Sequence, residues 1–203
     1  MPSPLVAPRA IVRHRSGHRS QLNVAPWLAE ADDVDLRLLQ RACGPVLDVG
    51  CGPGRHVEAL SLQAIEVLGI DLSPEFVSLA QERQRPVLLQ SVFAPMPRER
   101  EWQCALILDG SIGIGGNPTA LLRRIATLLA PYGRALVEVA LPDAPSEELT
   151  MEIEMDDGCH AAFEWASLSA SDMYAVAHAS QFTLSHVWED SGRWFAQLDL
   201  PVS

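Results

Sequence analysis

Short runs of apolar residues alternate with segments of helical periodicity along the middle of the chain. The apolar runs predict five strands, at 46–49, 66–70, 87–90, 104–108 and 135–139. The segments between them predict helices, and two begin with good capping residues: Asp32 or Asp33 in one, and Ser73 followed by Pro74 in another. Strands that alternate with helices indicate a parallel sheet with helices on both faces.

After the fifth predicted strand the pattern changes. The segments Thr150–Met155 and Cys159–Trp165 flank Asp157-Gly158, a pair of residues typical of a tight hairpin turn. We therefore expect a β-hairpin insertion at about 144–168, between the fifth strand and the rest of the fold.

The C-terminal residues predict one helix at 169–180 and two further strands at 182–189 and 194–200. The predicted fold class is α/β. It is a doubly wound, Rossmann-like sheet of seven strands, mostly parallel, with an antiparallel C-terminal strand. The predicted organisation is an N-terminal arm at 1–30 followed by one domain at 31–203, because 203 residues suit a single domain of ~100–200 residues.

Composition narrows the classes of partner. No apolar stretch approaches the ~18 residues of a membrane span, and no secretion signal is evident, so we expect a cytoplasmic protein without a membrane partner. The net charge of −11 repels polyanions and makes nucleic acid an unlikely partner. Residues 1–25 depart from this charge with four arginines and no acid; they are either a short basic arm for an anionic ligand or a partly mobile leader. A monomer and a homodimer are both compatible with the sequence.

A glycine-rich loop, Asp48-Val-Gly50-Cys-Gly52-Pro-Gly54, follows the first predicted strand and precedes a helix. Glycines let the backbone turn tightly and approach a ligand, and the helix N-terminus offers free N–H groups. Asp71 ends the second predicted strand, where a carboxylate can accept hydrogen bonds from both hydroxyls of a ribose. The order of strand, loop, helix, strand and acid therefore predicts a nucleotide-like ligand.

The spacing of the glycines argues against a dinucleotide. The dinucleotide fingerprint G-x-G-x-x-G needs a glycine at its sixth position, and counting from Gly50 that position is Arg55. The glycines instead run 50, 52 and 54, with Asp48 before them.

Two motifs resemble those of class I methyltransferases that use S-adenosylmethionine (SAM). Val-Leu-Asp-Val-Gly-Cys-Gly-Pro-Gly-Arg-His at 46–56 resembles the first motif of that family, and Gly-Ile-Asp-Leu-Ser-Pro at 69–74 resembles the second. The resemblance extends over roughly 45–140. It implies a Rossmann-like fold, SAM as the cofactor, and transfer of a methyl group to an unidentified small-molecule acceptor.

The resemblance also implies a role for each matching loop residue. Gly50, Gly52 and Gly54, with Cys51 between them, would cradle the methionine part of SAM. Asp48 would hold the amino group of SAM, directly or through water.

The second motif would bind the nucleoside. Asp71 would accept hydrogen bonds from the ribose hydroxyls, and Leu72 would pack on the adenine. Ser91 and Val92 align with the positions at the adenine edge, where serine replaces the family's usual acid.

Candidates for chemistry are few. Asp109 and Gly110, after the fourth strand, match the family's position beside the sulfonium. Asp109 and His160 are weak candidates for a general base, which is needed only if the acceptor arrives protonated; the catalytic residues stay unknown. The metal-binding Asp-Asn pair of catechol-type members is absent after the fifth strand, so no metal is expected.

The segment at 109–117 carries four glycines. Two interpretations are open: a backbone that approaches the cofactor or a bulky substrate, and a flexible loop before the helix at Pro118. Two alternatives to the enzyme are also open. One is a SAM-binding protein without catalysis, and the other is an NAD(P)-dependent oxidoreductase, which Arg55 disfavours.

Overall fold

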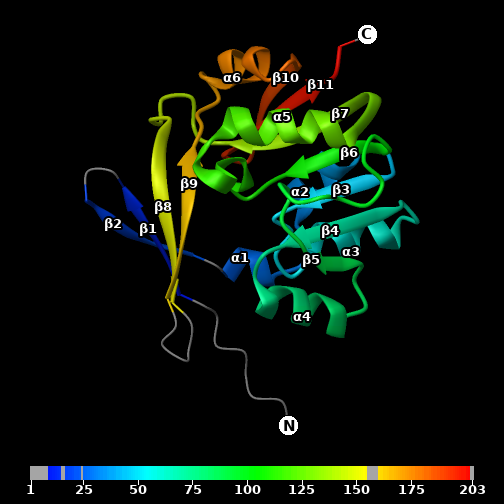
Figure 1. Ribbon diagram of the computed structural model, residues 1–203, viewed down its shortest axis with the longest axis horizontal. Helices are drawn as coiled ribbons and strands as arrows, with labels where there is room; N and C mark the ends of the chain where they lie inside the picture. Colours follow the sequence, from blue (N-terminus) through cyan, green and yellow to red (C-terminus); the bar gives the residue numbers. More distant parts are fainter. Residues whose placement is uncertain (1–8, 15–16, 24, 155–159, 202–203) are drawn as a thin grey trace.

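A computed structural model describes residues 9–14, 17–23, 25–154 and 160–201. Its strands form two sheets, shown in Figure 1. The main sheet has seven strands in the order β10-β11-β7-β6-β3-β4-β5, and the second has four in the order β2-β1-β8-β9.

The main sheet confirms the predicted fold class. Its strands are β3 (Val46–Val49), β4 (Val67–Asp71), β5 (Val87–Leu89), β6 (Trp102–Ile107), β7 (Leu129–Val139), β10 (Thr183–Asp190) and β11 (Arg193–Asp199). Strands β3 to β7 pair in parallel, and β11 is antiparallel to both of its neighbours, β7 and β10. All of β3 is buried, as expected of a central strand covered on both faces.

Helices cover both faces of the main sheet. They are α2 (Asp33–Leu39), α3 (Arg55–Leu62), α4 (Pro74–Glu82), α5 (Pro118–Leu128) and α6 (Met173–Ala179), whereas the short α1 (Ala25–Leu28) has no buried residue. Side chains of α5 and α6 belong to one buried apolar cluster, and those of α2, α3 and α4 belong to the other. The predicted caps are present, since Asp32 accepts a hydrogen bond from Asp35 N and Ser73 accepts one from Phe76 N.

Strand β7 begins earlier than the sequence predicts. Tyr132 and Gly133, a pair typical of a turn before the strand predicted at 135–139, lie inside it. Tyr132 has φ 64°, and the pairing register of β6 with β7 shifts between Trp102 and Cys104. The turn residues therefore form an irregularity within one long strand, because the residues before them already pair with β6.

The second sheet joins the beginning of the chain to the segment after β7. Its strands are β1 (Arg9–His14), β2 (Arg19–Leu22), β8 (Glu147–Glu154) and β9 (His160–Ser167). All three pairings are antiparallel. The predicted turn at Asp157-Gly158 lies outside the described residues. The leader interpretation of the N-terminal residues is wrong for 9–14 and 19–22, because these residues pair as strands.

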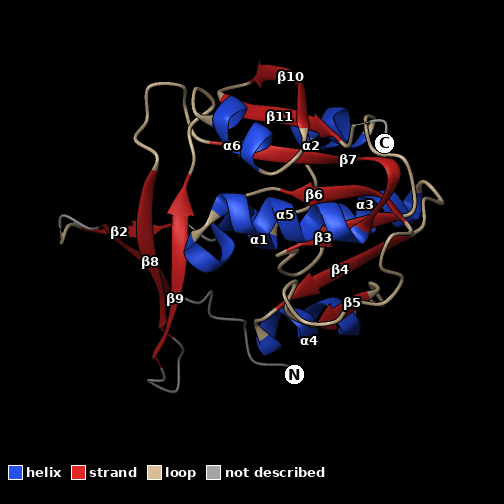
Figure 2. Ribbon diagram, turned by 45° about the horizontal axis from the view of Figure 1, so that its top comes forward, coloured by secondary structure: helices blue, strands red, loops and turns tan. Residues whose placement is uncertain are grey.

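The second sheet stands beside the main sheet, as Figure 2 shows for β8 and β9. The carboxyl ends of β4 and β6 point toward it in Figure 1. None of the helices in the described part of the chain has the length and apolar character that crossing a bilayer requires.

Candidate functional site

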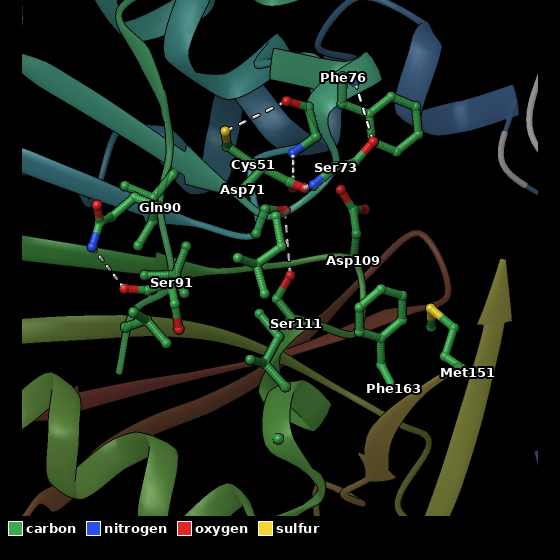
Figure 3. A pocket seen from close by; sticks show the side chains of 18 of the residues that line it. Cys51, Asp71, Ser73, Phe76, Gln90, Ser91, Asp109, Ser111, Met151 and Phe163 are labelled. Carbon is green, nitrogen blue, oxygen red and sulfur yellow. Dashed lines mark hydrogen bonds between the residues drawn. The ribbon is translucent and has the colours of Figure 1, made fainter. Parts of the chain in front are cut away.

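A cavity of about 580 Å³ lies where the carboxyl ends of the main-sheet strands face β8 and β9. This volume falls within the ~300–1,000 Å³ of small-molecule sites. The main sheet contributes the loop after β3 and residues that follow β4, β5 and β6, and the second sheet contributes Met151 and Phe163. Figure 3 shows Phe163 and Met151 on the Asp109 side of the cavity, with Gln90 and Ser91 on the opposite side.

The glycine loop lines this cavity through Gly50, Cys51 and Gly52. Gly50 has φ 69°, and a Cβ there would lie 2.6 Å from Ser111 Oγ, so both the backbone conformation and the close approach require glycine. Gly54 does not line the cavity; it precedes α3 and faces Arg85 and Val87.

Asp71 is the acid that fixes the loop. Its Oδ2 accepts a hydrogen bond from Gly52 N at 2.8 Å, and its Oδ1 accepts one from Ser73 N at 2.8 Å. Burial raises the pKa of the Asp71 carboxyl above its ordinary value, while the backbone N–H donors act in the opposite direction. Each carboxylate oxygen has a second lone pair, so both can still accept from a ligand.

The residues expected at the adenine edge line the cavity together. Leu72, Ser91 and Val92 all contribute, and Gln90 beside them was missed by the sequence analysis. The side chain of Leu72 is half-exposed, whereas Val92 is buried.

Asp48 lies beneath the loop, outside the cavity lining. Its Oδ2 is buried, and none of the described groups donates a hydrogen bond to it, although His56 Nδ1 lies 3.7 Å away. His56 Nε2 lies 3.3 Å from Asp35 Oδ1. Burial acts to lower the pKa of His56, but the Asp35 and Asp48 carboxylates outweigh it and raise the pKa to about 9. The His56 ring is therefore a buried cation at neutral pH.

Arg55 ties this buried charge to the cavity. It is 6% exposed and lines the cavity. Its Nη1 and Nη2 donate to the two Asp109 oxygens at 2.6 and 2.9 Å, and its Nε donates to Asp35 Oδ2 at 2.8 Å. In the sequence, Arg55 stands out only because it replaces the sixth-position glycine of a dinucleotide site; the guanidinium fork, which matches a carboxylate on each side, was not predicted.

A second arginine completes the network from the far end of the chain. Arg193 Nη1 donates to Asp35 Oδ1 at 2.8 Å, and its Nε and Nη2 donate to Glu138 at 2.9 and 2.8 Å. Glu138 Oε2 in turn accepts from Asp109 N at 2.9 Å. Asp109 has φ 54°, a left-handed conformation that non-glycine residues seldom adopt, and it is held at both its backbone and its carboxylate.

These bonds set the charge of Asp35. Burial raises the pKa of the Asp35 carboxyl, but the neighbouring His56 ring and the hydrogen bonds from Arg55 and Arg193 outweigh it and hold the pKa well below its usual range. Asp35 therefore stays ionised, and Asp109 is bound on both oxygens by Arg55.

The glycine-rich segment after β6 docks the second sheet. Ser111–Gly116 forms a 3₁₀ helix, η1, that packs against β9. A Cβ at Gly113 would lie 2.2 Å from the Ala166 carbonyl oxygen and 2.5 Å from the Trp165 ring. The flexible-loop interpretation is thus wrong, because the glycines are needed for the backbone of η1 to approach a strand. Gly110, expected beside the sulfonium, does not line the cavity.

His160 begins β9 and pairs in register with Glu154, but its side chain lies outside the described part of the structure. Its role as a base stays a prediction.

The cavity also has an aromatic wall, which the sequence did not predict. It comprises Trp27, Phe76, Phe93, Phe163 and Trp165. The rings of Trp27 and Phe76 meet edge to face with centroids 6.2 Å apart. No local pattern identifies these residues, because they come from separate elements.

Comparison with known proteins gives a family match. A family model described as "Methyltransferase domain" matches residues 24–187 of the chain. A trans-aconitate 2-methyltransferase from Paracidovorax citrulli is 29% identical over 121 residues, which are 58% of this chain and 46% of that protein. A putative methyltransferase from Bacillus subtilis is 25% identical over 147 residues, 68% of this chain and 60% of that protein. The chain thus spans about half the length of the curated relatives it matches.

A solved structure shares the fold. The SAM-dependent methyltransferase from Bacteroides fragilis, in complex with S-adenosyl-L-homocysteine, matches with a TM-score of 0.79 and 23% identity. The match covers 96% of this chain and 88% of that one.

Proposed function

The chain belongs to the methyltransferase-domain family, and from this premise we propose that it transfers a methyl group from S-adenosylmethionine to a small-molecule acceptor. The observation that carries the proposal is the cavity lined by both the glycine loop and Asp71. Relatives with methyltransferase names support it, and so does the shared fold.

The residues present fit SAM in three respects. Asp71 offers lone pairs to the ribose hydroxyls while it holds the loop through Gly52 N. The loop presents backbone rather than a side chain to the cavity at Gly50, where a Cβ would lie 2.6 Å from Ser111 Oγ. Asp48 Oδ2 is a buried acceptor without a donor among the described groups, which suits an ammonium group reached directly or through water. Leu72, Ser91 and Val92 would hold the adenine. Bound there, SAM supplies an electrophilic methyl group.

Methyl transfer forms a bond between the acceptor nucleophile and the methyl carbon and breaks the carbon–sulfur bond, whose electron pair stays on sulfur. The chain's main task is alignment of the two partners, since proximity and orientation supply much of the rate. The main sheet would hold the donor and the second sheet would hold the acceptor. Exclusion of water from the aromatic wall strengthens each polar contact inside the cavity.

Asp109 has the role of an anchor in this proposal. Both of its oxygens accept hydrogen bonds from Arg55, so neither is free to take a proton from an acceptor without losing a charged partner. Its negative charge, close to the expected sulfonium, instead favours a cationic ligand. The acceptor nucleophile therefore loses its proton to solvent or to a group outside this network.

Calorimetric titration with SAM and with S-adenosylhomocysteine tests the donor site. Asp71→Ala is expected to weaken both by about 10–100-fold, the loss associated with hydrogen bonds to a charged group. Asp143→Ala is the matched control, because Asp143 is an exposed acid outside the cavity lining. Binding of NAD in place of SAM would contradict the proposal. So would equal affinities of the two variants for SAM, provided that both fold as judged by circular dichroism.

A further inference from the structure

The cavity has an unusual balance of charge. Arg55 is the only lysine, arginine or histidine among the described residues that line it. Its guanidinium is shared between Asp35 and Asp109, which take hydrogen bonds from Nε, Nη1 and Nη2. Because four of its five N–H donors are already taken by these two carboxylates, Arg55 has little capacity left for an anionic ligand.

Carboxylates outnumber this single cation along the wall. Asp71, Glu75, Asp109 and Glu164 all line the cavity. The chain as a whole adds a net charge of −11. An acceptor that carries its own carboxylate or phosphate would meet like charges and would lose its water without gaining a partner, and both effects cost free energy.

The rest of the wall on the acceptor side is apolar and aromatic. Phe163 and Met151 stand opposite each other in the β8–β9 pairing and lie on the Asp109 side of the cavity in Figure 3. Trp165, on the same strand as Phe163, adds an indole ring. Aromatic faces bind flat apolar rings by offset stacking and also attract cations.

We propose that the acceptor is a flat, largely apolar molecule that carries no negative charge, such as a phenol or an aromatic amine. This inference rests on the proposed function, since it names the class of molecule that the methyl group would reach. It also predicts that tricarboxylates and phosphorylated metabolites are poor ligands of this chain.

Three naphthalene derivatives of similar shape test whether the cavity disfavours negatively charged ligands near pH 7. Of these, 2-naphthol is neutral, 2-(aminomethyl)naphthalene is a cation, and 2-naphthoate is an anion. Each is titrated by calorimetry into the full chain saturated with S-adenosylhomocysteine. We expect the neutral and cationic probes to bind about tenfold or more tightly than the anion. Equal or tighter binding of 2-naphthoate overturns the inference, and so does a lack of binding by all three probes.

A charge placed on the wall sharpens the test. Phe163 is 36% exposed, so Phe163→Lys can be accommodated without burying the new ammonium. This variant should gain affinity for 2-naphthoate and lose affinity for the cationic probe. Tyr174→Lys adds the same charge on α6, outside the cavity lining, and should leave the preference unchanged. The same shift in both variants would overturn the inference, since net charge alone would then set the preference.

The first titration separates this inference from the function on which it rests. If S-adenosylhomocysteine fails to bind, the proposed function fails. If it binds and 2-naphthoate is the preferred probe, the proposed donor site is supported and only the inference about the acceptor's charge is wrong.

Discussion

The main sheet and the second sheet are stabilised by different kinds of interaction. The main sheet is buried on both faces by two apolar clusters, and a buried network of Asp35, Arg55, His56 and Arg193 lies at the site it supports. The second sheet is held mainly by the packing of η1 against β9, and it carries exposed charged pairs, as in Arg13 and Arg19 with Glu152.

This difference matches the two tasks of the proposed site, which are to bind the donor and to bind the acceptor. The half that would hold the donor is built on a sheet with deep burial and fixed charges. The half that would hold the acceptor is an apolar wall attached by close backbone contact. Change in the second half should therefore disturb the first half little, whereas change in the buried network should disturb the whole fold.

Loss of Arg55 is the strongest way to test the first part of this comparison. Arg55→Met leaves Asp35 with one cation fewer in a buried position, and removal of one partner from a buried ion pair costs about 3–5 kcal/mol in the free energy of unfolding. Urea denaturation measures this loss.

Arg37→Met is the matched control. Arg37 also binds an aspartate through two hydrogen bonds of 2.8 Å, to Asp190, but half of its side chain is exposed. Its loss should be far smaller, because water screens and replaces an exposed pair. Similar losses of unfolding free energy in the two variants would show that burial does not make the ion pairs of the main sheet more important for stability.

The second test uses the pH dependence of stability. The folded-state pKa of His56, about 9, lies above the ordinary value of 6.5, so the charged ring stabilises the native state. This contribution is fully present below pH 6.5 and is lost as pH rises through about 9. The wild type should lose stability over that window with a slope of at most about 1.4 kcal/mol per pH unit, and His56→Gln should flatten it. An unchanged slope in the variant would mean that the ring is not a cation in the folded chain.

The sequence predicts these two regions unequally. The strands and caps of the main sheet are signalled locally, by apolar runs and by residues such as Ser73 before Pro74. The glycine loop and Asp71 are likewise contiguous with the strands that place them. In contrast, β1 pairs with β8, and the Arg13–Glu152 pair joins residues 139 positions apart. Arg193 and Asp35 are 158 positions apart. No local pattern specifies such partners, so the strands at 9–14 and 19–22, the aromatic wall and the arginine network became visible only in three dimensions.

The third test loosens the second sheet alone. Gly113→Ala puts a Cβ within 2.2 Å of the Ala166 carbonyl oxygen, and the backbone must shift, at a cost of about 1–3 kcal/mol. Hydrogen exchange should speed up at the amides of β8 and β9 while those of β3 and β4 keep their protection.

Gly192→Ala serves as the control for this variant. A Cβ there meets nothing within 4 Å, although its φ of 84° adds backbone strain in the β10–β11 turn. It should leave exchange in β8 and β9 unchanged. Faster exchange throughout the main sheet of Gly113→Ala would show that the two sheets unfold as one unit, against the comparison.

The smallest effect is expected where the second sheet carries its charges. Glu152→Gln removes the partner of both Arg13 and Arg19, whose side chains are about half exposed. Exposed pairs contribute ~0.2–1 kcal/mol, so the free energy of unfolding should fall by less than about 1 kcal/mol and high salt should hide most of the change. A loss at low salt as large as that of Gly113→Ala would mean that charge rather than the η1 contact holds the sheet in place. In that case the two regions would differ only in exposure, and the acceptor wall would be expected to loosen with ionic strength.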